Sequence, residues 1–224
     1  MYNSPKNRLL HDKQDCNFQS ISEKCDIKTI RKRIDSITDL HTLHQVVSSF
    51  DGLDIKRGAK NLVFGDGNPK ANLMLIGEAP GEEEDIKGIP FCGRSGKLLK
   101  NILLSVGIEH KDYYITNTIF WRPPANRKPT DTEIEMCKPF VEKHISLIKP
   151  KVLLMVGATA AESFLNLKDP MKYLRKQEFT YQNQYTDNPI RAFVIFHPSY
   201  LLRQPRQKKN MYFDMLKIKD KWKQ

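Results

Sequence analysis

The sequence predicts an α/β fold: a three-layer α/β/α sandwich with a central, mainly parallel four-stranded sheet. The first observation is a set of short, unbroken apolar runs, typical of strands buried on both faces. The second is that helical patterns, with apolar residues three or four positions apart, alternate with these runs along the chain. Alternating strands and helices build a parallel sheet covered by helices on both sides.

The first helix is expected over residues 29–49, where apolar residues recur at helical spacing. Residues 1–28 are polar and aperiodic, so we expect a poorly ordered N-terminal extension followed by a single domain over 29–224. The strands are expected at NLMLI (72–76), YYITNT (113–118), VLLMV (152–156) and AFVIF (192–196). Further helices are expected at 95–107, from the capping box at Thr130 to Pro150, at 158–165 and at about 207–222. The irregular segment 166–191 is expected to hold a hairpin insertion at EFTYQ.

The composition favours an anionic partner. Lys and Arg number 37 against 26 Asp and Glu, a net charge of +11, which suits nucleic acid, a membrane surface or a phosphorylated ligand. No apolar run approaches the roughly 18–20 residues of a membrane helix, and the N-terminus lacks the apolar core of a signal peptide. We therefore expect a cytoplasmic, nucleoid-associated protein. The cysteines, at positions 16, 25, 92 and 137, form no CxxC pair and are expected to stay reduced.

Polar, Gly and Pro residues follow all four expected strands. They are GEAPG (77–81), Asn117 with FWRPPANRKP (120–129), Gly157, and HPSYLLR (197–203). Ligands bind beyond the carboxyl ends of such strands, so these residues should share one rim. The rim carries no Walker A lysine, no HExxH and no third glycine of a dinucleotide fingerprint, and adjacent acids in EEED (82–85) do not favour a metal site.

Three residues of this rim suit a planar, hydrogen-bonding ring. Phe91 offers a face for stacking, the Asn117 amide can read a ring edge, and His197 can donate to a carbonyl oxygen. Arginines and lysines beside them suit a phosphate backbone. The combination predicts a pocket for a base flipped out of nucleic acid.

Four segments carry a resemblance to a known family. GEAPGEEEDIKGIPFCGRSGKLL, TNTIFWRPPANRKPTDTEIEMC and HPSYLLR, preceded by VFGDGNPKANLMLIG, closely resemble the family 4 uracil-DNA glycosylases over about residues 50–217. The resemblance implies a monomeric enzyme of base excision repair. It would hydrolyse the N-glycosidic bond of flipped-out deoxyuridine in single- or double-stranded DNA, releasing uracil and leaving an abasic site.

The resemblance also implies roles for individual residues. Gly77, Glu78, Ala79 and Gly81 match the motif that lines the pocket and addresses uracil and the catalytic water. Glu84 matches the residue that excludes the thymine methyl at C5, Phe91 the stacking ring, Asn117 the reader of the uracil edge, and His197 the donor to O2. The matching catalytic set is Glu78, Ala79 and His197.

DNA contacts are expected on both sides of the pocket. Pro198, Ser199, Leu201 and Leu202 resemble the loop that enters the minor groove and fills the gap left by the flipped nucleotide. Phosphate contacts are expected from six basic residues, Arg122, Arg127, Arg203, Arg206, Lys208 and Lys209.

The chain departs from the related glycosylases at two places. The family commonly holds a [4Fe–4S] cluster through four cysteines, and the matching positions are Phe50, Leu53, Trp121 and Cys137. One thiolate cannot hold such a cluster, so we expect it to be lost and no metal to be bound. The second departure is Ala79, where the best-known family of these enzymes carries a water-orienting Asp.

Two other functions stay open at this stage. A glycosylase-like domain could bind DNA or abasic sites without chemistry, which Ala79 and the missing cysteines would permit. A glycosylase could also prefer another deaminated base, such as hypoxanthine.

Overall fold

The computed structural model describes residues 26–219 and 221. The predicted α/β sandwich with a mainly parallel sheet is confirmed, but the sheet has six strands, in the order β1-β3-β2-β4-β6-β5. The strands are β1 (Asp66–Gly67), β2 (Leu73–Gly77), β3 (Tyr113–Asn117), β4 (Val152–Val156), β5 (Glu178–Tyr181) and β6 (Ile190–Ile195). The four predicted strands form the parallel centre, β3-β2-β4-β6.

The two additional strands lie at the edges and pair antiparallel. β1 is only two residues long, and β5 has a mostly exposed pattern, so neither carries the apolar run that marks a buried strand. β5 lies at EFTYQ, where the hairpin insertion was predicted, but its partner is β6, the fourth predicted strand, so this segment adds one strand to the edge of the sheet.

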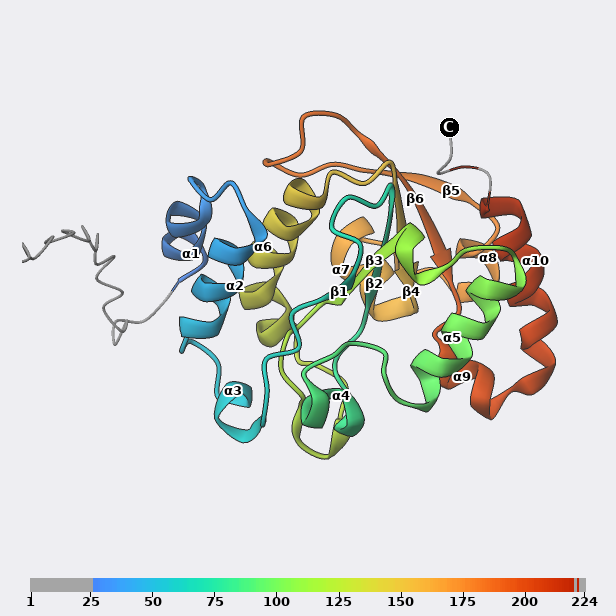
Figure 1. The fold of residues 1–224 in the computed structure, drawn as a ribbon, viewed down its shortest axis with the longest axis horizontal. Helices are drawn as coiled ribbons and strands as arrows, with labels where there is room; N and C mark the ends of the chain where they lie inside the picture. Colours follow the sequence, from blue (N-terminus) through green and yellow to red (C-terminus); the bar gives the residue numbers. More distant parts are fainter. Residues whose placement is uncertain (1–25, 220, 222–224) are drawn as a thin grey trace, which may run out of the picture.

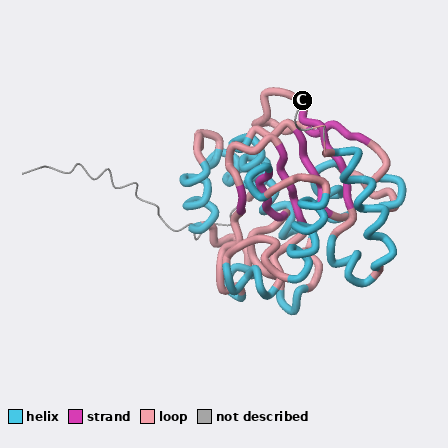
Figure 2. The backbone as a smooth tube through the Cα atoms, turned by 45° about the vertical axis from the view of Figure 1, so that its right-hand side comes forward, coloured by secondary structure: helices cyan, strands magenta, loops and turns pink. Residues whose placement is uncertain are grey.

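Helices cover both faces of the sheet, as Figures 1 and 2 show. One face carries α1 (Ile27–Ile34), α2 (Leu40–Ser49), α6 (Asp131–Ile148) and α7 (Ala158–Leu165). The other carries α5 (Arg94–Ser105), α9 (Pro198–Arg203) and α10 (Lys208–Ile218). The short elements are α3 (Ile55–Gly58), α4 (Glu82–Lys87), α8 (Met171–Leu174), η1 (His110–Asp112), η2 (Pro124–Asn126) and η3 (Pro205–Gln207).

Strand residues alternate between two cores. Met74 and Ile76 of β2 belong to the core under α6, whereas Leu73 and Leu75 belong to the core under α5 and α10. Successive side chains of a strand point to opposite faces, so both faces of a central strand must be apolar. The unbroken runs in the sequence have this cause.

Three predicted helical or loop segments differ in the structure. The helix predicted over 29–49 is two helices, because Asp39 accepts a hydrogen bond from the Thr42 backbone N–H and starts α2 anew. The predicted loop HPSYLLR is mostly α9, which His197 caps and Pro198 opens. α10 ends at Ile218 rather than near 222.

The predicted N-terminal extension lies largely outside the described residues, although α1 already begins at Ile27. Cys16 and Cys25 also lie outside them. Among the helices that the structure describes, none has both the length and the apolar character needed to cross a membrane.

Candidate active site

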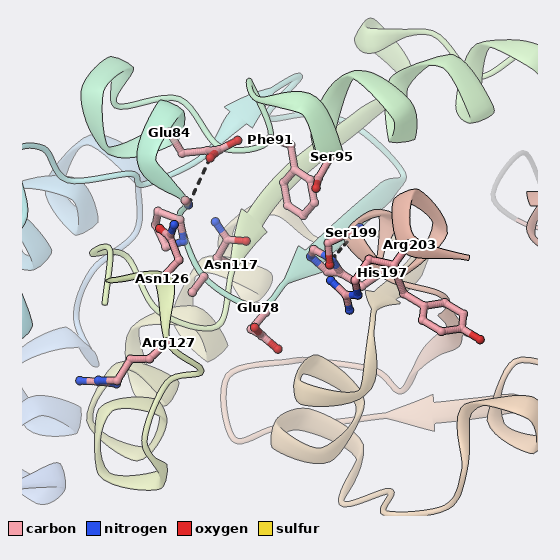
Figure 3. A pocket seen from close by; sticks show the side chains of 14 residues that line it. Glu78, Glu84, Phe91, Ser95, Asn117, Asn126, Arg127, His197, Ser199 and Arg203 are labelled. Carbon is pink, nitrogen blue, oxygen red and sulfur yellow. Dashed lines mark hydrogen bonds between the residues drawn. The ribbon is translucent and has the colours of Figure 1, made fainter. Parts of the chain in front are cut away.

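A cavity of about 530 Å³ lies at the carboxyl ends of the central strands, on the predicted rim. Its walls come from the segment after β2, the end of β3, and the start of α9. Figure 3 shows Glu78, Phe91, Asn117 and His197 around it. Gly77 and Asn117 are register partners at the ends of β2 and β3, so the pairing itself places the amide beside the loop after β2.

Asn117 presents an unsatisfied atom to this cavity. The residue is 1% exposed, and its Oδ1 is buried without a hydrogen-bond partner among the described residues. A buried acceptor without a donor costs about 1–3 kcal/mol, so such atoms are rare in folded proteins. A Cβ at Gly77 would collide with this oxygen and with the Phe91 ring. Glycine at the end of β2 therefore makes room for both groups.

Phe91 forms a fixed wall of the cavity. Its φ of +53° lies in the left-handed region, which is unusual for a bulky residue. A Cβ at Gly96 would overlap the Phe91 backbone, so Gly96 lets α5 pack directly against this turn. The Phe91 ring lies 6.0 Å from the His197 ring, centroid to centroid, at an interplanar angle of 39°.

His197 is held in one tautomer. Its Nδ1 lies 3.2 Å from the Ser199 backbone N–H, which can only donate, and 2.7 Å from Ser199 Oγ. Burial lowers the pKa of His197, with the Glu78 carboxylate acting in the opposite direction. A neutral ring that accepts at Nδ1 carries its proton at Nε2. His197 is thus a neutral donor.

Glu78 is held by a residue that the sequence analysis did not single out. Thr159 Oγ1 donates to Glu78 Oε2 at 2.5 Å, and Thr159 is 4% exposed in the first turn of α7. No described group binds the second carboxylate oxygen, Oε1. The signal was available: Thr159 follows Gly157 at the end of the third predicted strand, on the same rim.

Glu84 joins the two loops that frame the cavity. Its Oε2 accepts from the Gly81 N–H at 3.1 Å, and its Oε1 accepts from the Gly93 N–H at 2.8 Å. Asp85 is 2% exposed and accepts from the backbone of Lys60 and Asn61. Glu84 and Asp85, two of the four acids at positions 82–85, therefore hold the segment after β2 in place by accepting hydrogen bonds from backbone N–H groups.

Comparisons with known proteins identify the family of the chain. The sequence model of the uracil DNA glycosylase superfamily matches residues 64–217. A type-4 uracil-DNA glycosylase from Archaeoglobus fulgidus is 36% identical over 168 residues, 74% of this chain and 84% of that protein. The chain belongs to the type-4 family of the uracil-DNA glycosylase superfamily. A type-4 uracil-DNA glycosylase from Saccharolobus solfataricus is 39% identical, with 72% and 76% of the two chains covered. One from Thermotoga maritima is 41% identical, with 64% and 72% covered.

The structure brings most of the predicted pocket residues of this type-4 family member together. Glu78, Ala79, Gly81, Glu84, Phe91, Asn117 and His197 all line the cavity. Gly77 lies directly behind it, where its missing Cβ leaves space. Asn126 also lines the cavity, with a left-handed φ of +55°, and was not predicted.

The residues predicted to enter the minor groove lie on α9, which buries some of them and exposes others. Leu201 is fully buried and packs in the core under α5 and α10, and Pro198 is also buried. Ser199 is bound to His197. Leu202, at 36% exposure, therefore remains as the apolar side chain of this segment that faces solvent. Neighbouring residues of a helix point about 100° apart, so α9 buries Leu201 while Leu202 stays at the surface, which the loop prediction did not include.

The predicted phosphate-binding residues also differ in their surroundings. Arg127 is engaged by Glu133, with nitrogen–oxygen distances of 2.6 and 2.8 Å, and Arg122 donates to Asn126 Oδ1 at 2.8 Å. Exposed basic side chains continue from α9 into α10: Arg203, Arg206, Lys208 and Lys209.

The positions that match the cluster ligands meet in one apolar core. Phe50, Leu53, Trp121 and Cys137 are each at most 7% exposed, and the Phe50 ring lies 6.4 Å from Trp121 and 5.1 Å from Phe140. A [4Fe–4S] cluster needs four thiolates, so these residues do not fit it. Burial raises the pKa of the Cys137 thiol to about 12. No group of three or more His, Cys, Asp or Glu within the described ranges could hold a metal ion.

Proposed function

We propose that this chain is a monofunctional uracil-DNA glycosylase that acts in base excision repair. The observation that carries the proposal is that Phe91, Asn117 and His197 line one cavity. Ser199 holds the His197 ring, and Asn117 Oδ1 is buried there without a hydrogen-bond partner among the described residues. Family membership supports the same activity, because the type-4 relatives are named for it.

Asn117 reads the base in this proposal. Its Oδ1 accepts from uracil N3–H, which supplies the donor that the folded chain does not provide, and the amide nitrogen donates to O4. Cytosine presents the opposite pattern at these two positions. A bidentate contact of this kind contributes about 1–3 kcal/mol of discrimination. Phe91 stacks on the ring, and Glu84 closes the space beside C5.

His197 and Glu78 act on the bond that breaks. The C1′–N1 electron pair leaves with uracil, and the charge that develops on O2 accepts a hydrogen bond from the neutral Nε2–H of His197. Water adds to the oxocarbenium-like C1′ and passes its proton to a base. Glu78, fixed through Oε2 by Thr159, orients that water with Oε1. This carboxylate takes the place left by Ala79.

Apolar packing replaces the iron–sulfur cluster in this proposal. The support is the buried contact of Phe50 with Trp121 and Phe140 at the matching positions. Anaerobically purified protein should be colourless and free of iron by ultraviolet–visible spectroscopy and metal analysis. A brown protein with about four irons per chain would show that other residues hold a cluster.

The substrate is uracil-containing DNA, single- or double-stranded, bound by a monomer. The basic balance of the chain supports a polyanionic partner. We place the protein in the cytoplasm, associated with the nucleoid, where such DNA is found.

One assay separates this function from its alternatives. Oligonucleotides carrying uracil, hypoxanthine or thymine are treated with the protein and then with alkali, which breaks the strand at an abasic site. We expect strand breaks at uracil and none at thymine, and Asn117→Ala is the control. Strand breaks at hypoxanthine without breaks at uracil would show that hypoxanthine is the substrate. DNA binding without any strand break would show that the protein is a non-catalytic binding module.

A further inference from the structure

Two aromatic rings lie on the solvent side of α10. Tyr212 is 38% exposed and Phe213 is 48% exposed, and their centroids are 5.9 Å apart. The buried side of the helix is formed by other residues, Met211, Asp214, Met215 and Ile218. The fold therefore does not use the exposed ring surfaces for packing.

Basic residues lie beside these rings. Lys208 is four positions before Tyr212, and Lys209 is four positions before Phe213, so each lysine and its ring are neighbours on the helix surface. All four residues are exposed. Cations that follow a backbone, alternating with rings on which bases stack, are the features of a single-strand binding surface.

The chain connects this surface to the candidate active site without a break. Arg203 lines the cavity at the end of α9, Arg206 follows in η3, and α10 begins at Lys208. Figure 1 shows α9 leading into α10 along one edge of the molecule. A strand with a base in the cavity would meet these cations next.

We propose that Tyr212 and Phe213, with Lys208 and Lys209, form a platform for single-stranded DNA flanking the damaged nucleotide. The proposal rests on the proposed glycosylase function and narrows its substrate class. The occupant is a polyanion because the surface is basic, and it is single-stranded because bases within a duplex already stack on each other and offer no free face to a ring. The platform makes the protein favour single strands over duplexes.

The test measures binding of uracil-free DNA by fluorescence anisotropy, with labelled oligothymidylate and a labelled duplex of equal length. In the double variant Tyr212→Leu with Phe213→Leu, we expect binding of the single strand to weaken about fivefold or more, and binding of the duplex to stay near wild type. The ring-keeping variant Tyr212→Phe with Phe213→Tyr should retain binding of the single strand. Lys208→Gln with Lys209→Gln should weaken both DNAs and flatten the salt dependence.

Tyr173→Leu is the matched control, because Tyr173 is 51% exposed on α8, also next to a lysine, and outside the α9-to-α10 segment. It should bind both DNAs like the wild type. Unchanged single-strand binding in the α10 leucine variant, equal loss for both DNAs, or an equal effect of Tyr173→Leu would overturn the platform. Because the probe DNA has no uracil, that result is independent of whether the protein releases uracil.

Discussion

Asn117 and Trp121 are four residues apart on one segment but lie in opposite kinds of surroundings. Asn117 ends β3 with a buried oxygen that has no partner among the described residues, beside a phenylalanine in a left-handed conformation. Trp121 is 2% exposed and packs against Phe50 and Phe120 in an apolar core. By resemblance, the first position keeps the residue of the family and the second has lost it.

The difference shows where the fold tolerates features that lower its stability. Unsatisfied polar atoms and strained backbone persist where they prepare a site for a ligand. At Phe50 and Trp121, which match cluster ligands by resemblance, hydrocarbon side chains fill the space and contribute stability. Substitutions in the pocket should therefore lower activity, and substitutions in the apolar core should lower the free energy of unfolding.

The largest expected effect on activity comes from Asn117→Ala. Release of uracil should fall roughly 10²- to 10³-fold, the range for removing one preorganised hydrogen-bonding group. The thermal midpoint should not fall, because the substitution removes an acceptor that lacked a partner. Single-turnover kinetics measure the rate, and thermal melts measure the midpoint. Cleavage at the wild-type rate would show that Asn117 does not read the base.

The apolar core should show the reverse pattern. Phe50→Ala should lower the free energy of unfolding by about 3–5 kcal/mol, while uracil release per folded molecule stays near wild type. Urea denaturation and an active-site-normalised assay measure the two quantities. Leu104→Ala, at a 45% exposed position on α5, is the control with little expected loss. A loss of activity without a loss of stability would contradict the comparison.

A smaller effect is expected where Thr159 holds Glu78. Thr159→Val keeps the shape but removes the hydrogen bond to a carboxylate, which contributes about 1.5–3 kcal/mol. The value of kcat should fall about tenfold with KM nearly unchanged, because substrate binding does not use this contact. Thr159→Ser keeps the hydroxyl and should restore most of the rate. Equal damage from Val and Ser would mean that packing, and not the hydrogen bond, is what matters.

The most gradual effect concerns pH and a buried histidine in the apolar core. His144 is fully buried, lies 3.0 Å from Tyr114 Oη through Nε2, and stacks on Phe64. Burial, together with a smaller effect of His44, lowers its pKa from 6.5 to about 3. Below pH 6.5 the unfolded chain binds a proton that the folded chain does not, so stability must fall as the pH falls from 6.5 toward 3.

The expected slope from this one group is about 1.4 kcal/mol per pH unit within that window. Urea denaturation at several pH values measures it. His144→Phe combined with Tyr114→Phe removes the titrating ring without leaving the hydroxyl unpaired, and should flatten the dependence. An unchanged slope in that variant would assign the acid sensitivity to other groups.

The parallel centre of the fold could be predicted because its cause is local. Strands buried on both faces must be apolar throughout, and on the intervening helices the buried apolar residues recur every three or four positions. The edge strand β1 could not, since two half-buried residues lack such a pattern. For β5 the sequence predicted a hairpin at EFTYQ, but not its pairing with the fourth predicted strand. The break between α1 and α2 was missed because Ile37 kept the helical spacing through the turn.

By itself the sequence determined the α/β class, the rim on which the site lies, and the residues that suit a flipped base, because residue type and strand order fix these. Only the tertiary structure decided what each side chain touches. It gave Glu84 two backbone donors, Glu78 the hydroxyl of Thr159, Arg127 the carboxylate of Glu133, and Leu201 a place in the core. The contact of Glu78 with Thr159 joins residues 81 positions apart, and the other contacts depend on how a loop or a helical turn folds. The chemistry of a single residue does not show either of these.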